Sequence, residues 1–169
     1  LQQVTSGYLP VDETGKLEEI GSAKADVFSG LLEDMPAGEP VVVFARFTAD
    51  IAKIREVVLK AGRTSSELSG SANELADWQD GKTDVLVAQI QTGKEGIDLV
   101  RAAYAVYYSV GYSLGDFEQS LARIHRPGQT RPVTYYHIVA ADTIDVAIRR
   151  SLDEKRDVIQ AILSDRRTI

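Results

Sequence analysis

The sequence predicts an α/β domain, with a mainly parallel sheet that has helices on both faces. Short, continuous apolar runs such as residues 41–44 are typical of strands buried on both faces. Segments with helical periodicity lie between these runs, which favours parallel strands joined by crossover helices. The chain has 169 residues, 44% of them hydrophobic, so it can form one domain with a substantial core.

The first 21 residues do not fit this alternation. They contain Pro10, three glycines and few large apolar residues in any period, and residues 12–15 suggest the tip of a short hairpin. We expect no core residue here. Because Leu1 and its neighbours read like the middle of a longer sequence, we interpret residues 1–21 as a lead-in segment and residues 22–169 as the domain.

The first half of the domain alternates helices and strands. Ser22 is a candidate N-cap for an amphipathic helix that ends near Pro36. Trp78 lies on a short helix and is expected to anchor the core. The expected elements are a helix from Ser22, a strand over 41–44, a helix over 48–61, a strand near 67–68, a helix over 71–78 and a strand over 84–89.

The second half continues the alternation and closes with a long helix. A strand over 104–110 contains three tyrosines that are expected to pack against the sheet. A helix begins at Asp116, and a strand over 133–139 follows it. The last helix opens at Asp142 or Thr143. Its expected apolar face consists of Ile144, Ile148, Leu152, Ile159 and Ile162.

Residues 119–129 contain the most specific pattern in the chain, Q-x-x-x-R-x-x-R-x-G-Q. On a helix, one face becomes an apolar stripe of Phe117, Leu121 and Ile124. The opposite face presents Gln119, Arg123 and Arg126. Guanidinium groups stay charged at any working pH and bind phosphate oxygens, so these arginines are expected to face an anion such as a transferring phosphoryl group. Pro127 places Arg126 at the frayed helix end.

A second polar segment follows the strand over 84–89. Ligands of parallel sheets sit at the carboxyl ends of strands. The hydroxyl of Thr92 and the backbone amide of Gly93 could therefore hold a phosphate. Asp98 could bind a ribose hydroxyl or a metal-bound water, or could cap a helix.

Charge and composition restrict the classes of partner. The net charge is −6, but residues 123–169 carry nine basic and six acidic groups. Nucleic-acid contact is therefore expected along a local track, not across a basic surface. No apolar run has the length of a membrane span. Two histidines without any cysteine predict no metal site. The absence of cysteine also fits a soluble protein of a reducing cytoplasm.

Several segments together resemble the C-terminal RecA-like lobe of a superfamily-two helicase of the Swi/Snf chromatin-remodelling type. Residues 119–129 match most specifically, and the resemblance covers nearly the whole chain. The other matching segments are 41–47, 68–70, 91–99 and 142–145. The resemblance implies a three-layer RecA-like fold, with residues 22–169 as the helicase C-terminal domain and residues 1–21 leading in from a missing upstream lobe.

The resemblance also implies a role for each matched residue. Arg123 and Arg126 would be the catalytic residues, arginine fingers that reach across a cleft to ATP. The ATP and its Mg²⁺ would be held mainly by the missing upstream lobe. Further cofactor-binding residues would be Gln119, Gly96 and Asp98. The nucleic-acid backbone would be contacted by Arg46, Ser69, Gly70, Thr92 and Gly93.

The implied partners are the upstream RecA-like lobe of the same parent chain and double-stranded DNA, without a membrane. The implied location is the cytoplasm, or the nucleus of a eukaryote. Alone, the domain is expected to bind ATP weakly and to hydrolyse none. Departures from the family pattern indicate a divergent branch: Tyr112-Ser113-Leu114 stands where many members have Trp-Asn-Pro, Ser109 where aspartate is common, and Glu95 where glycine is expected.

Two alternatives remain open. Residues 111–115 fit the G-x-S-x-G motif of serine hydrolases and lie between a strand and a helix, which makes Ser113 a candidate nucleophile. Only Asp116 and Glu118 fall between Ser113 and His137, and both lie in the same turn, so a triad lacks a suitable acid. The second alternative is a non-catalytic nucleic-acid or protein docking module that has the fold without the motor.

Overall fold

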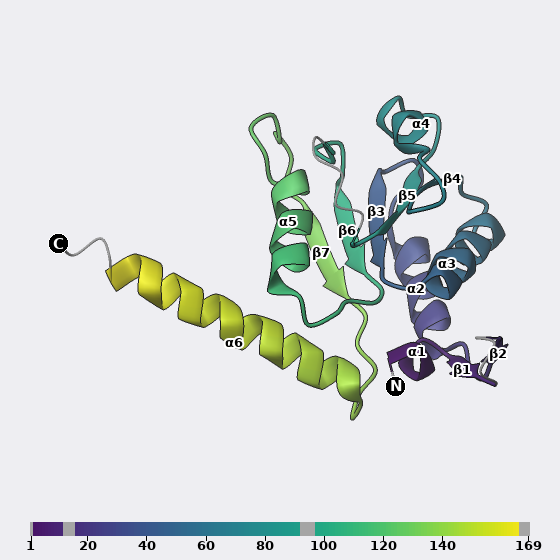
Figure 1. Cartoon of the computed structure of the whole chain (residues 1–169). Coiled ribbons are helices and arrows are strands. Elements are labelled where there is room, and N and C mark those ends of the chain that lie inside the picture. Colours follow the sequence, from purple (N-terminus) through teal and green to yellow (C-terminus); the bar gives the residue numbers. More distant parts are fainter. Residues whose placement is uncertain (1, 12–15, 92–96, 166–169) are drawn as a thin grey trace.

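The computed structural model describes residues 2–11, 16–91 and 97–165, with side chains described as far as residue 160. A five-stranded sheet forms the middle layer (Figure 1), and its strands pair in parallel in the order β4-β5-β3-β6-β7. The strands are β3 (Val41–Ala45), β4 (Ser65–Leu68), β5 (Val85–Gln89), β6 (Tyr104–Tyr107) and β7 (Thr134–His137). The predicted parallel sheet is confirmed.

Helices cover both faces of this sheet, which confirms the predicted three layers. One face is covered by α2 (Ala23–Asp34) and α3 (Thr48–Lys60). The other face is covered by α4 (Leu75–Gln79), α5 (Leu114–Ile124) and the first half of α6 (Ile144–Asp165).

The side chains of the central strand β3 alternate between two cores. All five of its residues are buried, as the continuous apolar run predicts. Val43 packs in the core that contains Phe28 of α2 and Ile54 of α3. Phe44 packs in the opposite core and stacks on Tyr107, with ring centroids 5.0 Å apart. The predicted core anchor Trp78 is fully buried and donates its indole N–H to the Asp84 carbonyl at 3.1 Å.

Several predicted boundaries are wrong by a few residues. The helix predicted over 71–78 begins only at Leu75, because residues 71–74 form a turn that returns to β4. In that turn the Glu74 N–H donates to the Glu67 carbonyl, and Leu68 bridges Asn73. The strands predicted over 104–110 and 133–139 are shorter, ending at Tyr107 and His137.

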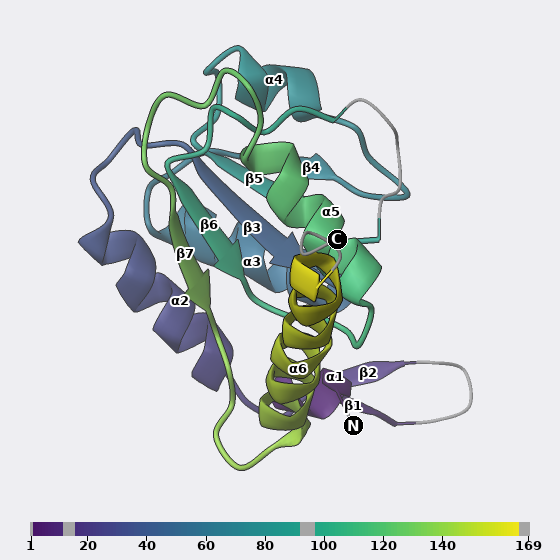
Figure 2. The same ribbon diagram turned by 90° about the vertical axis from the view of Figure 1, so that its left-hand side faces the viewer.

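The lead-in segment is tied to the domain more closely than predicted. It contains α1 (Gln2–Thr5) and an antiparallel pair, β1 (Tyr8–Pro10) and β2 (Leu17–Glu19), which confirms the strands of the expected hairpin. Its tip, residues 12–15, lies outside the described residues. None of its described residues belongs to the two hydrophobic cores, as expected, although Ser6 and Gly7 are buried. Figure 2 shows α1 beside the first turns of α6.

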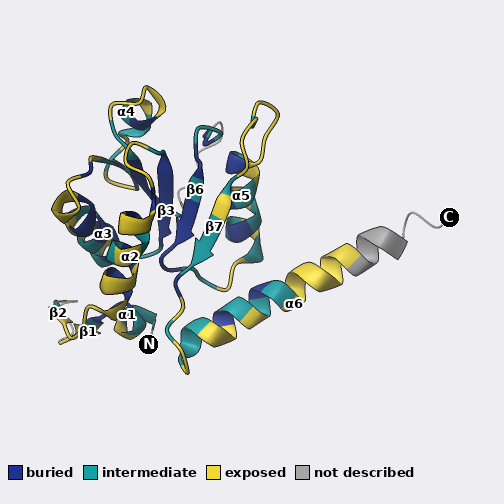
Figure 3. Ribbon diagram, turned by 180° about the vertical axis from the view of Figure 1, so that it is seen from behind, coloured by how far each residue is buried: buried dark blue, intermediate teal, exposed yellow. Residues whose placement is uncertain are grey.

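The second half of α6 stands away from the body. Ile148 and Leu152 are buried as predicted, whereas Ile159 is 48% exposed. Figure 3 shows this change from buried to exposed residues along the helix. The side chain of Ile162 is not among those described. Within the described ranges, no helix combines the length and the apolar character needed to cross a membrane.

Candidate functional site

The helix α5 presents the signature residues as the sequence predicts. Ser113 caps its first turn by accepting a hydrogen bond from the Asp116 N–H at 3.2 Å. The apolar stripe faces the core, with Phe117 and Ile124 buried and Leu121 half-buried. The opposite face presents an exposed Gln119 and a half-buried Arg123, and the exposed Arg126 lies just after the helix end.

Both arginines lie against the segment that leads into β6. The Leu99 N–H donates to the Arg123 carbonyl at 3.0 Å, and Nη1 of Arg126 donates to the Ile97 carbonyl at 3.3 Å. Arg126 follows the last helical residue, Ile124, by two positions, as expected for a frayed helix end before proline. The C-terminal end of α5 is therefore fixed to residues 97–99.

The Gly-Gln pair that ends the signature has a structural task that sequence reasoning missed. Gly128 has a φ of 108°, a conformation that favours glycine. Nε2 of Gln129 then donates to the Val100 carbonyl at 2.9 Å. Through this carboxamide, the loop after Arg126 is bonded to the segment that precedes β6.

The two guanidinium groups are close enough to affect each other. Burial, and then the positive charge of Arg126, lower the pKa of Arg123 from its usual value, while Asp116 opposes the shift. The repulsion between two positive charges at a protein surface is offset when an anion lies between or beside them. The arrangement therefore suits a polyanionic ligand such as a triphosphate.

Asp98 lies close to these arginines but has a local partner. Its Oδ1 accepts a hydrogen bond from the Val100 N–H at 2.9 Å, and its carbonyl accepts one from Nε2 of Gln79 at 2.9 Å. The hydrogen bond from Val100 forms a local turn. Asp98 does not cap a helix, because the next element in the chain is the strand β6. Gly96, the other predicted nucleotide contact, lies outside the described residues.

A second cluster lies at the carboxyl ends of β3, β4 and β5. Nε2 of Gln89 donates to the Arg46 carbonyl, and Oε1 of Gln89 accepts from the Gly70 N–H, both at 3.3 Å. This carboxamide joins two segments that the sequence assigned to nucleic-acid contact. Sequence reasoning missed Gln89; the available signal was a polar residue at the end of a buried strand. The predicted contacts Thr92 and Gly93 lie outside the described residues.

Ser69 belongs to this cluster, but its hydroxyl is used within the protein. The side chain is buried and donates to Oε1 of Glu67 at 2.6 Å. The same hydroxyl oxygen accepts hydrogen bonds from the N–H groups of Ser71 and Ala72, both at 3.2 Å. Ser69 therefore shapes the turn, and the backbone of Gly70 is the more exposed part of it.

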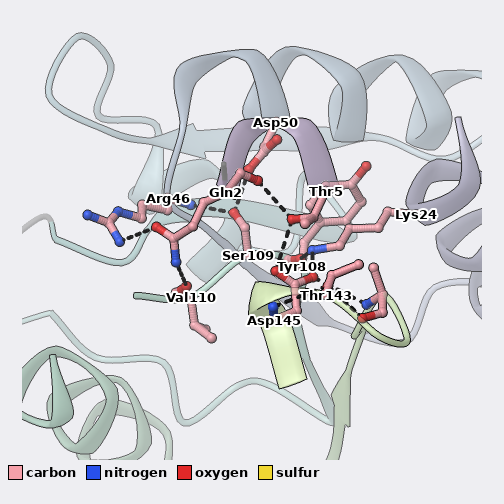
Figure 4. Close-up of polar contacts among 11 residues, drawn as sticks. Gln2, Thr5, Lys24, Arg46, Asp50, Tyr108, Ser109, Val110, Thr143 and Asp145 are labelled. Atoms are coloured by element: carbon pink, nitrogen blue, oxygen red, sulfur yellow. Dashed lines mark hydrogen bonds and ion pairs between the residues drawn. The ribbon is translucent and has the colours of Figure 1, made fainter. Parts of the chain in front are cut away.

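A buried polar network supports the same edge of the sheet (Figure 4). The Ser109 hydroxyl accepts from the Arg46 N–H at 2.8 Å and donates to the fully buried carboxylate of Asp50. Burial raises the pKa of Asp50 above its usual value.

A second part of the network surrounds Asp145. Lys24, also buried, forms an ion pair with Asp145 at 2.5 Å, and Thr5 donates to Asp145 at 2.9 Å. The network joins α1, α2, α3 and α6.

The geometry of a serine hydrolase is not assembled. The hydroxyl of Ser113 caps α5, while His137 stacks on Tyr107 with centroids 4.7 Å apart and contacts Arg149 at 2.8 Å. Within the described part of the chain, no group of three histidine or acidic side chains is placed to hold a metal ion.

Comparison with known proteins agrees with the fold and with the signature helix. A family model described as "Helicase conserved C-terminal domain" matches residues 23–128, which is more than half of the chain and includes all of α5. Among solved structures, the C-terminal part of the Fun30 ATPase domain superposes with a TM-score of 0.69 at 23% identity. This similarity covers 76% of the present chain and 44% of that one.

Curated relatives are longer than this chain. Protein p41 of Acyrthosiphon pisum secondary endosymbiont phage 1 is 28% identical over 95% of the chain and 35% of its own length. The chromatin-remodeling ATPase INO80 of Homo sapiens is 27% identical over 75% of the chain and 9% of its own length. The chain thus spans about a third of the first relative and about a tenth of the second.

Proposed function

The chain belongs to the family of the helicase conserved C-terminal domain, and we propose that it is the second motor lobe of an ATP-driven DNA translocase of the Swi/Snf type. The relatives include a protein named as a chromatin-remodeling ATPase, which favours ATP hydrolysis coupled to work on DNA. The proposed partners are an upstream RecA-like lobe of the same parent chain and duplex DNA. The proposed location is the cytoplasm, or the nucleus in a eukaryote.

The arginine pair of α5 is the observation on which this proposal depends. Arg123 and Arg126 would act as arginine fingers that approach ATP held, with Mg²⁺, mainly by the upstream lobe. When bound, ATP would supply the phosphoanhydride bond whose hydrolysis drives the motor. The described residues fit such a ligand, because two adjacent guanidiniums with mutually unfavourable charge lie at an accessible helix end. Gln119 and Asp98 would complete the nucleotide contacts, together with Gly96.

The cluster at the carboxyl ends of the strands would form half of the nucleic-acid groove. Arg46 would neutralise a phosphate, and the Gly70 N–H would donate to a backbone oxygen. Thr92 and Gly93 would extend this track. Because the Ser69 hydroxyl is used in the turn, we assign it the positioning of Gly70. A short track of this kind is compatible with a chain whose net charge is −6.

A test uses ATP hydrolysis by three preparations: the full-length protein, the 169-residue chain alone, and the full-length protein with Arg123→Ala. We expect hydrolysis that duplex DNA stimulates in the first, and none in the second, because the triphosphate and Mg²⁺ would lack their main site. The third should retain DNA binding but lose turnover. If the full-length protein hydrolyses no ATP with any nucleic acid, the docking-module alternative replaces this proposal.

A further inference from the structure

The guanidinium of Arg46 is held by a residue of the lead-in segment (Figure 4). Nη1 of Arg46 donates to Oε1 of Gln2 at 2.6 Å. Nε2 of the same glutamine donates to the Val110 carbonyl at 3.3 Å. Gln2 therefore connects the side chain of Arg46 to the loop that follows β6, although 44 residues separate the two side chains in the sequence.

Gly111 leaves the space that the guanidinium of Arg46 occupies. A Cβ atom at this position would lie 2.5 Å from Nη1 of Arg46 and 3.1 Å from its Cζ. The guanidinium can therefore occupy its observed place only because residue 111 has no side chain. The closest atoms belong to the flexible end of the arginine, so a methyl group here would displace the guanidinium and leave the backbone in place.

The main chain of Arg46 is fixed as well. Its N–H donates to the Ser109 hydroxyl, which is bonded to the buried Asp50, and its carbonyl accepts from Gln89. The guanidinium lies 5.5 Å from the ring centroid of Phe47. Among the residues that the structure describes, Nε and Nη2 have no hydrogen-bond partner. The Arg46 side chain is half-buried. Its Nη1 is held by Gln2, and its Nε and Nη2 can donate to a ligand.

We propose that Gln2 and Gly111 are positioning residues that aim the guanidinium of Arg46 at a phosphate of the nucleic-acid backbone. This inference rests on the proposed function, in which Arg46 contacts that backbone. An arginine that is already ordered loses less rotamer freedom on binding than a mobile one, which is worth a few-fold to about tenfold in affinity. The lead-in segment and the loop after β6 are thereby parts of the proposed nucleic-acid site.

The experiment measures binding of a labelled DNA duplex by the full-length protein, without nucleotide, over a series of salt concentrations. Arg46→Ala should reduce the slope of log affinity against log salt by about 0.9, the value for one phosphate contact. Gln2→Ala and Gly111→Ala should each weaken binding a few-fold. Neither should weaken it further when Arg46 is already alanine, because the effect passes through that side chain.

Gly115→Ala is the matched control for Gly111→Ala. It adds the same methyl group four residues away, where the nearest atom would lie at an ordinary contact distance of 3.9 Å. It should leave DNA affinity unchanged. Unfolding midpoints of all variants are measured in parallel, and Gly111→Ala should unfold at nearly the midpoint of the natural sequence, because the flexible guanidinium can move aside.

The outcomes separate the two levels of the proposal. If Arg46→Ala leaves both affinity and salt slope unchanged, the assignment of Arg46 to the nucleic-acid contact is wrong. If Arg46→Ala weakens binding but Gln2→Ala and Gly111→Ala do not, the positioning role alone is overturned. It is also overturned if the double variants lose affinity additively. A loss that disappears in the Arg46→Ala background supports it.

Discussion

His137 lies where a positive charge is unfavourable. Burial, and then the neighbouring Arg149, lower its pKa from 6.5 to about 4. The folded state therefore binds a proton less readily than the unfolded chain. The neutral imidazole stabilises the fold above pH 6.5, and this contribution is lost as the pH falls toward 4.

We expect this histidine to weaken the fold by about 2 kcal/mol between pH 7 and pH 5. His137→Phe keeps a ring to stack on Tyr107 and removes the titration, so its free energy of unfolding should depend less on pH in this range. The measurement is urea unfolding at the two pH values. His125→Gln, at an exposed position, serves as the control. An unchanged pH dependence in His137→Phe would contradict the assigned pKa.

The sequence predicts side chains well where period and polarity decide their environment. Phe117 and Ile124 are buried, and Gln119 and Arg126 are exposed, as the helical pattern requires. The sequence does not predict hydrogen bonds between polar residues that are far apart in the chain. Nothing local indicates that Gln2 binds Arg46 or that Gln89 joins Arg46 to Gly70, because these contacts exist only after the chain has folded.

Elements follow the same rule. The strand β3 and the helix α6 were predicted correctly, because a continuous apolar run and a long periodic pattern give strong signals. The short helix α4 was predicted to begin four residues too early, whereas its end was predicted to within one residue. The polar residues 71–74 return to β4 through backbone contacts with Glu67 and Leu68, and a single short window cannot reveal this return.

The docking of the lead-in segment depends on Gly7. This residue has a φ of 91°, and a Cβ atom here would lie 1.9 Å from the carbonyl oxygen of Gly21. Gly7→Ala should therefore detach the lead-in segment, at a cost of more than about 1 kcal/mol. Hydrogen exchange of residues 2–11 should become faster. Gly21→Ala, where nothing lies within 4 Å, should change little. Equal protection in both variants would contradict the described docking.

The point at which α6 leaves the body can be tested with two substitutions on the same helix. Leu152 is 1% exposed and Ile159 is 48% exposed. Leu152→Ala should lower the free energy of unfolding by about 2–5 kcal/mol through a cavity in the core. Ile159→Ala should change it by less than about 1 kcal/mol. Chemical denaturation measures both. Similar losses would mean that the second half of α6 packs against the domain.

At the scale of the whole molecule, one sheet separates two polar regions. Arg123 of α5 and Arg126, just after its end, lie against residues 97–99, which lead into β6. Arg46 and Gly70 lie at the carboxyl ends of the strands. A parallel sheet buried on both faces is a stiff connection between them. In the proposed motor, this lobe would transmit movement of the nucleotide end to the end that contacts DNA.

The sequence predicted the class of the sheet because alternating helices and apolar strands restrict the topology strongly. It also led to the correct family through the spacing of residues 119–129. It did not predict that the lead-in segment is part of the folded unit. That segment is held by a buried glycine and polar bonds to distant elements, such as Thr5 to Asp145, which leave no periodic trace.

In the proposed motor, Arg126 completes the ATP site, and ATP turnover by the full-length protein with saturating duplex DNA tests this role. Arg126→Ala should lower turnover by about 10³- to 10⁵-fold, as expected for a lost arginine finger. The fold should be retained, because the side chain is exposed and makes one 3.3 Å hydrogen bond among the described residues. Arg150→Ala, also exposed, should hydrolyse ATP normally. Turnover of Arg126→Ala within a few-fold of the natural protein would contradict this role.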